Sequence, residues 1–399
     1  MAKALAYLQS GGPTAVINSS LYGAIREAGE HKEISKVLGS LHGIEGLLFD
    51  DLADLSKEDP EQIELLLQTP GAALGSTRYK LPSDLEDERY QSIIKTVRKH
   101  DIGYILVNGG NDSMDTCSKL SRLFASKGMD VKVIGVPKTV DNDLSATDHC
   151  IGYGSAAKYV INTVKSVCVD ASCYKKGKVF VVEVMGRNAG WLTASVDILP
   201  APYRPDLIYL PEDAFDLDEF YKEVKKVHDA KGHCVVAISE GIVFPRDTSS
   251  ARVDAFGHIQ LGGAADALSR RVEQNLGLPT RSIELSLPQR AFPILVSKVD
   301  RDEAVECARV ACRAAVAGES GKMVSIRRIS SQPYQVAYEL KSVEGIANVE
   351  KKIPPEFLHN VHGLSQSFRD YLRPLVQGEV DVGYEDGIYK VASLRLLRD

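Results

Sequence analysis

Short apolar runs recur along the chain, and each is followed by a polar turn and then by a helical pattern. The runs are ALAYL (4–8), KVLGSL (36–41), GYILV (103–107), VKVIGV (131–136), KVFVVEV (178–184) and HCVVAIS (233–239). Apolar runs of this length, bounded by glycine and polar residues, are typical of buried strands. Strands that alternate with helical segments predict an α/β fold with mostly parallel sheets.

Two of these runs lead into clear helical segments. After the first run, Gly11-Gly12-Pro13 precedes a helix that is predicted to end near Ala28, with Gly29 as its stop signal. After the third run, the apolar stripe of a second helix carries Met114, Cys117, Leu120 and Phe124.

The turns that follow the predicted strands share a polar, often glycine-containing character. They read QSGGPT, NGGND, PKTVDND, MGRNAG and SEG. In open α/β sheets, ligands bind outside the carboxyl ends of the strands. Because these turns all follow strands, we expect them to meet in one composite site.

Composition narrows the class of protein. The 399 residues allow about two or three domains. The net charge is -6 and there is no basic block, which argues against nucleic acid as a partner. No apolar run of about 18 residues and no signal-peptide pattern occurs, so we expect a cytoplasmic protein without membrane contact. The seven cysteines form no CxxC pair, which fits a reducing compartment.

The two glycine pairs are typical of phosphate sites. Gly11 and Gly12 let the backbone approach an anion, and a following helix would aim its N–H groups at it; an ordinary strand-to-helix turn is the alternative. The second pair precedes Asn111 and Asp112, which places a carboxylate where an anion is expected. Asp112 is equally well interpreted as a helix N-cap.

The turn PKTVDND (137–143) carries the densest set of chemical groups. Asp141 and Asp143 are two residues apart, so in an extended loop they would point to opposite sides. One could meet a hydroxyl and the other a metal or a second hydroxyl, while Lys138 and Thr139 add a cation and a donor. A solvated turn is the alternative, because Asp and Asn are common turn residues.

Three arginines and one histidine are the remaining candidates for site residues. Arg187 beside Gly186 suits phosphate or sugar oxygens, with a surface arginine as the alternative. His258, Arg252 and Arg290 lie later in the chain. A lone histidine is more often structural, and Arg290 could equally form a surface ion pair.

Taken in order, these motifs resemble the phosphofructokinase family. The matching motifs are SGGPTAVIN, LGSTR, GGNDS, PKTVDND, EVMGRNAG, AISEG and GHIQLGG, and ANVEKKIP (347–354) is similar to the family's C-terminal segment. The resemblance covers residues 3–320. It implies two Rossmann-like lobes with mostly parallel sheets and an active site in the cleft between them. The donor-binding lobe would span about 1–155 and the sugar-phosphate lobe about 156–260, each with a later segment, and 321–399 would be a C-terminal extension packing on this unit.

The family phosphorylates the 1-hydroxyl of fructose 6-phosphate, and the resemblance carries roles onto matching positions. Asp141 matches the base that takes the proton from the sugar hydroxyl. Gly11, Gly12, Arg78 and Ser113 match positions that hold the donor phosphates, with Arg78 bridging donor and acceptor. The sugar-binding positions are Thr139, Asp141, Asp143, Met185, Gly186, Arg187, Glu240, Arg252, His258 and Arg290, and Arg252 acts across a subunit boundary in many members.

Two positions separate the donor types in the family. Members that use ATP resemble GGDGS and PGTIDND, whereas members that use pyrophosphate resemble GGDDS and PKTIDND. The matching residues here are Asp112 and Lys138, which is the pyrophosphate pattern at both positions. An aspartate fills the space that the α-phosphate of a nucleotide needs and repels its charge. Lys138 would then stabilise the transferring phosphoryl group.

Three departures from the family pattern affect the expected ligands. Asn111 stands where the family has a metal-associated aspartate, which makes it a weaker ligand for the expected Mg²⁺ and shifts work to Asp112 or Asp143. Leu261 replaces an arginine of GHIQRGG, so Arg290 of LPQR is expected to bind the sugar phosphate instead. Lys178 replaces an arginine that reaches a neighbouring subunit in several relatives.

The resemblance thus predicts reversible phosphoryl transfer from pyrophosphate to fructose 6-phosphate, serving glycolysis and gluconeogenesis, in a homodimer or homotetramer. Three rivals stay open at this point. One uses ATP, and a second uses pyrophosphate with another sugar phosphate such as sedoheptulose 7-phosphate. The third is a catalytically silent regulatory subunit, although the intact Thr139, Asp141, Asp143 and Arg187 argue against it.

Overall fold

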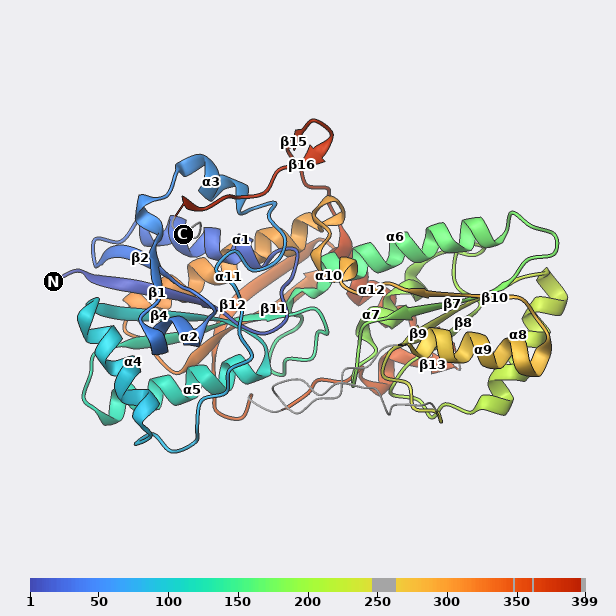
Figure 1. Ribbon diagram of the computed structural model, residues 1–399, viewed down its shortest axis with the longest axis horizontal. Helices are drawn as coiled ribbons and strands as arrows, with labels where there is room; N and C mark the ends of the chain where they lie inside the picture. Colours follow the sequence, from blue (N-terminus) through green and yellow to red (C-terminus); the bar gives the residue numbers. More distant parts are fainter. Residues whose placement is uncertain (246–262, 347–348, 361, 396–399) are drawn as a thin grey trace.

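The protein is described by a computed structural model, which covers residues 1–245, 263–346, 349–360 and 362–395. Two lobes lie side by side along the long axis of the molecule (Figure 1). The larger lobe contains an eight-stranded sheet and the smaller one a four-stranded sheet. The predicted α/β class with two mostly parallel lobes is confirmed.

The larger sheet is parallel except at its two edges. Its strand order is β12 (Tyr334–Ser342), β11 (Lys322–Ser331), β5 (Lys132–Thr139), β4 (Ile102–Gly109), β1 (Lys3–Gln9), β2 (Ile34–Ser40) and β3 (Leu52–Asp54). A short strand, β6 (Ile151–Gly152), pairs with β5. β12 and β3 are antiparallel to their neighbours.

Alternation along β1 explains how this sheet is covered on both faces. Leu5 and Tyr7 point to one face and Ala6 and Leu8 to the other, and all four are buried. The helices α1 (Ile17–Ala28) and α11 (Lys298–Val316) pack on the first face. The opposite face is covered by α2 (Ile44–Phe49), α4 (Glu88–Lys99) and α5 (Asn111–Ser126).

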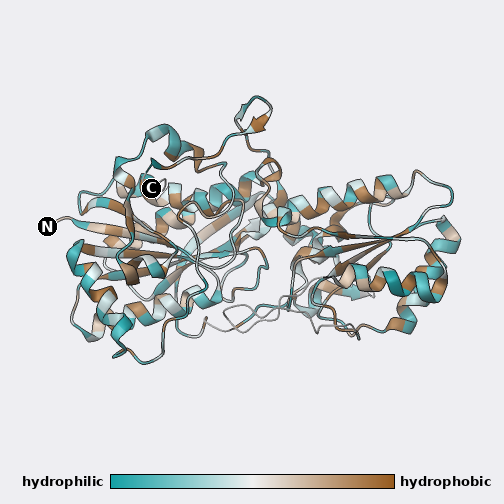
Figure 2. Ribbon diagram, viewed as in Figure 1, coloured by the Kyte–Doolittle hydropathy of each residue, from teal (hydrophilic) through white to brown (hydrophobic). Residues whose placement is uncertain are grey.

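The smaller sheet is entirely parallel, with the order β10 (Thr280–Glu284), β7 (Val179–Val184), β9 (Cys234–Ser239) and β8 (Leu207–Tyr209). Phe180, Val182 and Val184 of β7 pack toward α6 (Tyr153–Ala171), α7 (Trp191–Ala194) and α12 (Gln366–Leu372). The other face is covered by α8 (Leu217–Lys231) and α9 (Ala264–Leu276). The central strands of both sheets are therefore hydrophobic, whereas the outer helices carry both hydrophobic and hydrophilic residues (Figure 2).

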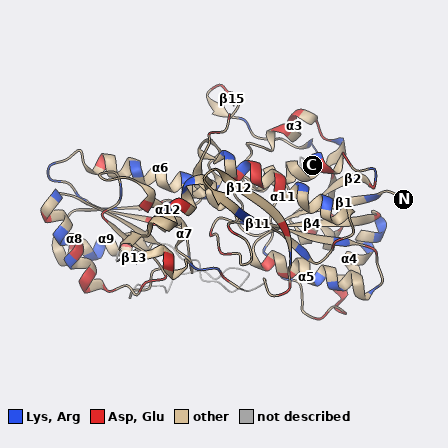
Figure 3. Cartoon of the chain, turned by 180° about the vertical axis from the view of Figure 1, so that it is seen from behind, with Lys and Arg blue, Asp and Glu red and all other residues tan. Residues whose placement is uncertain are grey.

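The remaining elements connect the lobes or lie at the surface. They are α3 (Pro60–Leu65), α10 (Pro288–Ala291), the hairpin β13 (Leu358–Asn360) with β14 (Gly363–Leu364), and the hairpin β15 (Tyr384–Glu385) with β16 (Ile388–Tyr389). Charged residues of both signs lie on the outer helices of the two lobes (Figure 3). None of the helices in the described ranges combines the length and apolar character needed to cross a lipid bilayer.

For the first predicted helix, the structure confirms the predicted end but not the predicted start. α1 ends at Ala28 with Gly29 after it, as expected. It begins only at Ile17, however, so irregular backbone separates the first glycine pair from the helix. A helix N-terminus directly behind Gly11 and Gly12 was therefore a wrong expectation, and only the second pair, followed by α5, has that arrangement.

Candidate active site

A cavity of about 550 Å³ lies between the two lobes, at the carboxyl ends of their central strands. The larger lobe contributes residues after β1, β4 and β5, and the smaller lobe residues after β7, β9 and β10. The predicted site residues that line it are Gly11, Gly12, Arg78, Asn111, Asp112, Ser113, Lys138, Thr139, Asp141, Asp143, Met185, Arg187, Glu240 and Arg290. Gly186 is buried between two of these positions, and Arg252, His258 and Leu261 lie outside the described residues.

The first glycine pair meets two cations. Gly11 has a φ of 78°, and its N–H donates to the carbonyl of Thr77 at 3.0 Å. The Lys138 ammonium donates to the carbonyl of Gly12 at 2.6 Å. A Cβ on Gly11 would lie 3.3 Å from that ammonium, and one on Gly12 would lie 3.0 Å from a guanidinium nitrogen of Arg290. The positive φ of Gly11 favours glycine there, and at Gly12 a side chain would displace the end of Arg290.

Asp112 occupies the first turn of α5 and is not its N-cap. The N-cap residue is Gly110, which has no side-chain cap bond, and α5 begins at Asn111. The capping interpretation of Asp112 is therefore wrong. A carboxylate in the first turn still interacts favourably with the helix dipole, and this one faces the cavity.

The turn after β5 directs both of its carboxylates into the cavity. Asn142, between them, has a φ of 55°, so the backbone is not extended there. The amide of Asp141 donates to Thr139 Oγ1 at 3.1 Å, and Asn142 Oδ1 accepts from the amide of Cys150 at 3.0 Å. The loop is therefore not the extended one for which opposite directions were expected, and Asp141 and Asp143 line the same cavity.

Burial and close charges shift the pKa values of the central groups. The pKa of the Asp141 carboxyl is raised by burial and by the carboxylates of Asp143 and Glu240, and Lys138 and Arg290 oppose this shift. The pKa of Lys138 is lowered to about 8 by burial and by Arg290, against the effect of the two aspartates. A carboxylate whose pKa is raised toward neutrality is suited to accept a proton.

The edge of the cavity formed by the smaller lobe, where the sugar is expected and which we call the sugar edge, is held by hydrogen bonds from backbone amides. The amide of Met185 donates to Gln289 Oε1 at 3.1 Å, and the amide of Gly186 donates to Glu240 Oε1 at 3.4 Å. Gly241 packs so tightly that a Cβ there would lie 1.8 Å from the carbonyl oxygen of Arg187. The Arg187 Nε is buried and has no hydrogen-bond partner among the described residues, which suits a group that meets a ligand.

Gln289 and Glu350 are two of the cavity residues that the sequence analysis did not single out. Gln289 is 2% exposed and holds Met185, and its position beside Arg290 in LPQR was the available signal. Glu350 also lines the cavity, because it bridges to Leu144 and accepts a hydrogen bond from Asn188 Nδ2 at 2.7 Å. No local pattern marks Glu350, since its place depends on contacts far apart in the sequence.

The edge of the cavity formed by the larger lobe, where the phosphoryl donor is expected and which we call the donor edge, contains oxygen atoms that could hold a divalent cation. Asn111 Oδ1 is buried without a hydrogen-bond partner among the described residues, and Asn111 Nδ2 lies 3.4 Å from Asp143 Oδ2. Magnesium in phosphoryl-transfer sites takes one or two protein oxygens together with phosphate oxygens and waters. Within the described ranges there is no cluster of three or more His, Cys, Asp or Glu side chains of the kind that cages a metal. The residues therefore fit a cation shared with a phosphate substrate.

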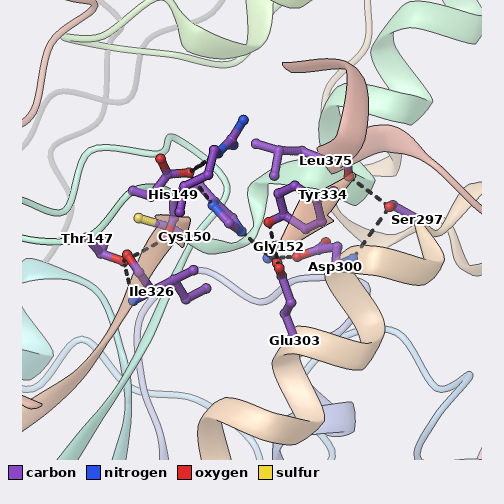
Figure 4. Close-up of polar contacts among 12 residues, drawn as sticks. Thr147, His149, Cys150, Gly152, Ser297, Asp300, Glu303, Ile326, Tyr334 and Leu375 are labelled. Atoms are coloured by element: carbon purple, nitrogen blue, oxygen red, sulfur yellow. Dashed lines mark hydrogen bonds and ion pairs between the residues drawn. The ribbon is translucent and has the colours of Figure 1, made fainter. Parts of the chain in front are cut away.

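A buried ionic network is centred on His149, and its members Glu303 and Tyr334 are shown with it in Figure 4. His149 Nδ1 lies 2.8 Å from Asp148 Oδ2, and its Nε2 lies 2.6 Å from Glu303 Oε2. The Tyr334 hydroxyl donates to Glu303 at 2.6 Å, and Arg328 pairs with Asp148 at 2.9 Å. Burial alone would lower the pKa of His149, but the carboxylates of Glu303 and Asp148 outweigh burial and raise it to about 9.

Comparison with known proteins defines the class that the two lobes and their cleft belong to. Residues 4–315 match the phosphofructokinase family, and the chain belongs to that family. It is 42% identical over 407 residues to the pyrophosphate–fructose 6-phosphate 1-phosphotransferase of Xanthomonas campestris pv. campestris (strain B100), covering 98% of this chain and 96% of the relative. The relative of the same name from Halomonas elongata is 41% identical, with 97% and 95% covered. A crystal structure of a pyrophosphate-dependent phosphofructokinase from Marinobacter aquaeolei superposes with a TM-score of 0.89 at 37% identity, covering 99% of this chain and 96% of that one.

Proposed function

We propose that this protein transfers a phosphoryl group from pyrophosphate to the 1-hydroxyl of fructose 6-phosphate, reversibly. The observation that carries the proposal is that Asp112 and Lys138 face the same cavity as Asp141. A carboxylate, a buried cation and a second carboxylate with a raised pKa thus lie together. The relatives named above act on these two substrates by name, and they match nearly the whole chain.

On the donor side, Gly11, Gly12, Arg78 and Ser113 would bind pyrophosphate. The backbone of a glycine pair and the cations beside it suit a small, highly charged anion. Asp112 would exclude a nucleotide, because its carboxylate occupies and charges the space beside the helix start. Pyrophosphate has no third phosphate to collide with that group.

During transfer, the bond between the bridging oxygen and the transferred phosphorus breaks as the sugar oxygen bonds to that phosphorus. Asp141 would take the proton of the 1-hydroxyl, and inorganic phosphate would leave. Lys138 would stabilise charge on the transferring group, since its ammonium is held in place by Gly12 before the reaction begins. Because the leaving group is itself an inorganic phosphate, the reaction is readily reversed.

On the sugar side, Met185, Gly186, Arg187 and Glu240 would bind the sugar ring and its hydroxyls, and Arg290 would bind the 6-phosphate. Thr139 and Asp143 would contact the sugar and the transferred phosphoryl group from the opposite edge. Arg252 and His258 belong to the same proposal, with Arg252 supplied across a subunit boundary in a homodimer or homotetramer.

Asn111 and Asp143 would hold Mg²⁺ on the donor side. When bound, the cation would neutralise charge on the pyrophosphate oxygens. A cytoplasmic location belongs to the proposal as well, and it is supported by all seven cysteines being free thiols.

One assay tests the assignment. Purified protein and Mg²⁺ are incubated with pyrophosphate or with ATP, together with either fructose 6-phosphate or sedoheptulose 7-phosphate, and the bisphosphate product is measured. We expect product with pyrophosphate and little with ATP. Product with ATP alone would overturn the donor assignment. Faster turnover of sedoheptulose 7-phosphate would overturn the sugar assignment, and no product with any combination would favour a silent regulatory subunit.

A further inference from the structure

The segment Glu350–Ile353 lies against the loop that carries the catalytic candidates. The amide of Lys351 donates to the carbonyl of Asp143 at 2.7 Å. The ammonium of the same residue donates to the carbonyls of Thr147 and Asp148, at 3.1 and 2.9 Å. Lys351 therefore binds both ends of the loop formed by residues 143–148.

The same lysine also contacts the sugar lobe. The indole N–H of Trp191 donates to the carbonyl of Lys351 at 2.9 Å, and the ammonium lies 5.4 Å from the centre of the indole ring. A cation at this distance over an aromatic face is attracted to it. Trp191 directly follows the MGRNAG turn, which carries Arg187, so Lys351 connects the reactive turns of both lobes.

Tyr371 of α12 holds the middle of the loop. Asn142 Nδ2 donates to the Tyr371 hydroxyl at 2.9 Å, and this hydroxyl donates to the carbonyl of Asp148 at 2.9 Å. Asn142 is the left-handed residue between Asp141 and Asp143. The orientation of both carboxylates therefore depends on a side chain more than two hundred positions further along the chain.

We propose that Lys351 and Tyr371 are positioning residues that fix the loop of Asp141 and Asp143 relative to the sugar-binding turn. The inference rests on the proposed function, because a reactive orientation has meaning only for a reaction at Asp141. Neither side chain is among the residues that line the cavity. Their effect is on turnover, since a displacement of the base by about 1 Å can lower a rate by about 100-fold.

Lys351→Met tests the role of the ammonium, because methionine keeps an unbranched side chain one atom shorter and leaves the backbone bonds possible. We expect kcat to fall about 100-fold while KM for pyrophosphate and for fructose 6-phosphate changes by less than about threefold. Lys352→Met is the matched control, since Lys352 is the adjacent lysine and is exposed. That variant should retain wild-type kcat and KM.

Hydrogen exchange gives a readout that does not depend on activity. Mass spectrometry of intact wild-type and Lys351→Met protein should show faster amide exchange across residues 143–150 in the variant, at unchanged exchange in the strands of the larger sheet. A loss of kcat without faster exchange in this loop, or a kcat within about threefold of wild type, would overturn the positioning role.

Tyr371→Phe covers the possibility that Lys351→Met does not fold. It removes one hydroxyl and keeps the ring, and we expect kcat to fall about tenfold at unchanged KM, because the lysine still holds the loop. An unchanged kcat would overturn the role of Tyr371. If wild type uses ATP, the donor assignment fails and the same comparison is made with ATP. A wild-type protein with no activity toward either donor would overturn the inference together with the function.

Discussion

The two edges of the cavity are built in different ways. On the donor edge, Lys138 and Asp141 are charged groups that perturb each other's pKa, and the backbone of Gly12 holds the lysine. On the sugar edge, Met185 and Gly186 are held by backbone hydrogen bonds to Gln289 and Glu240. The donor edge thus depends on the charge of single side chains, whereas the sugar edge depends on the shape of a turn. Changes at the first should affect turnover and donor choice, and changes at the second should affect KM for the sugar.

The largest effect is expected at Asp141. Asp141→Ala removes the base but leaves the backbone hydrogen bond from residue 141 to Thr139 possible. We expect kcat to fall roughly 10²–10⁴-fold with sugar binding largely kept, because a positioned base contributes about that much. Steady-state kinetics and binding of fructose 6-phosphate by calorimetry measure the two quantities. A loss of less than about tenfold would exclude the base role.

The second-largest effect, a change in the choice of phosphoryl donor, is expected at Asp112. Asp112→Gly removes the charge at the start of α5 and so relieves the like-charge clash with a nucleotide. We expect ATP binding to strengthen by about 10- to 100-fold, into the measurable range, and pyrophosphate use to fall. Asp115→Gly is the control, since it places glycine in the same helix at a residue that does not line the cavity. If ATP binding stays undetectable in Asp112→Gly, the aspartate is not the selector.

The sequence predicted six of the parallel strands and many of the cavity residues, whereas β8, β10 and β11 were not predicted. The strands β1, β2, β4 and β5 at the centre of the larger lobe are local apolar runs, and the carboxyl ends of parallel strands meet at one edge. Residues at or shortly after the carboxyl ends of β1, β4 and β5, such as Gly12, Asp112 and Lys138, were therefore placed correctly in the cavity. Their roles in binding and catalysis stay predictions.

What the sequence did not predict depends on contacts between distant segments or on single backbone angles. Glu350 reaches the cavity only because its segment bridges to Leu144. The direction of the two aspartates depends on the left-handed conformation of Asn142, which its contacts with Tyr371 and Cys150 support. Neither the bridge of Glu350 nor the backbone angle of Asn142 belongs to a repeating hydrophobic pattern, so hydrophobic periodicity does not predict them.

The sugar edge is tested by a change of shape without a change of charge. In Gly241→Ala, the new methyl group would lie 1.8 Å from the carbonyl oxygen of Arg187, so the turn must move. Overpacking of this kind costs about 1–3 kcal/mol, and we expect KM for fructose 6-phosphate to rise about tenfold, with a smaller change in kcat. Gly29→Ala is the control, because Gly29 is helical and its Cβ would meet nothing closer than 3.5 Å. An unchanged KM would mean that the turn does not control sugar binding.

The smallest expected effect is a change in the pH dependence of folding stability, caused by the buried ion pairs of His149. His149 lies between Asp148 and Glu303, and the wider network includes Arg328 on Asp148 and Tyr334 on Glu303. Because its folded pKa is raised to about 9, the protonated form stabilises the fold. This contribution is fully present below the unfolded pKa of about 6.5 and is lost as the pH rises through about 9.

His149→Gln keeps hydrogen-bonding capacity but cannot carry the charge, so it should remove this pH dependence. We expect the free energy of unfolding of wild type to exceed that of the variant by about 1–3 kcal/mol more at pH 6.5 than at pH 9, from urea titrations at both pH values. Lys138, with a pKa lowered to about 8, makes an opposite contribution above that pH, but it is present in both proteins and cancels in the difference. An equal difference at the two pH values would show that His149 is not protonated in the folded protein.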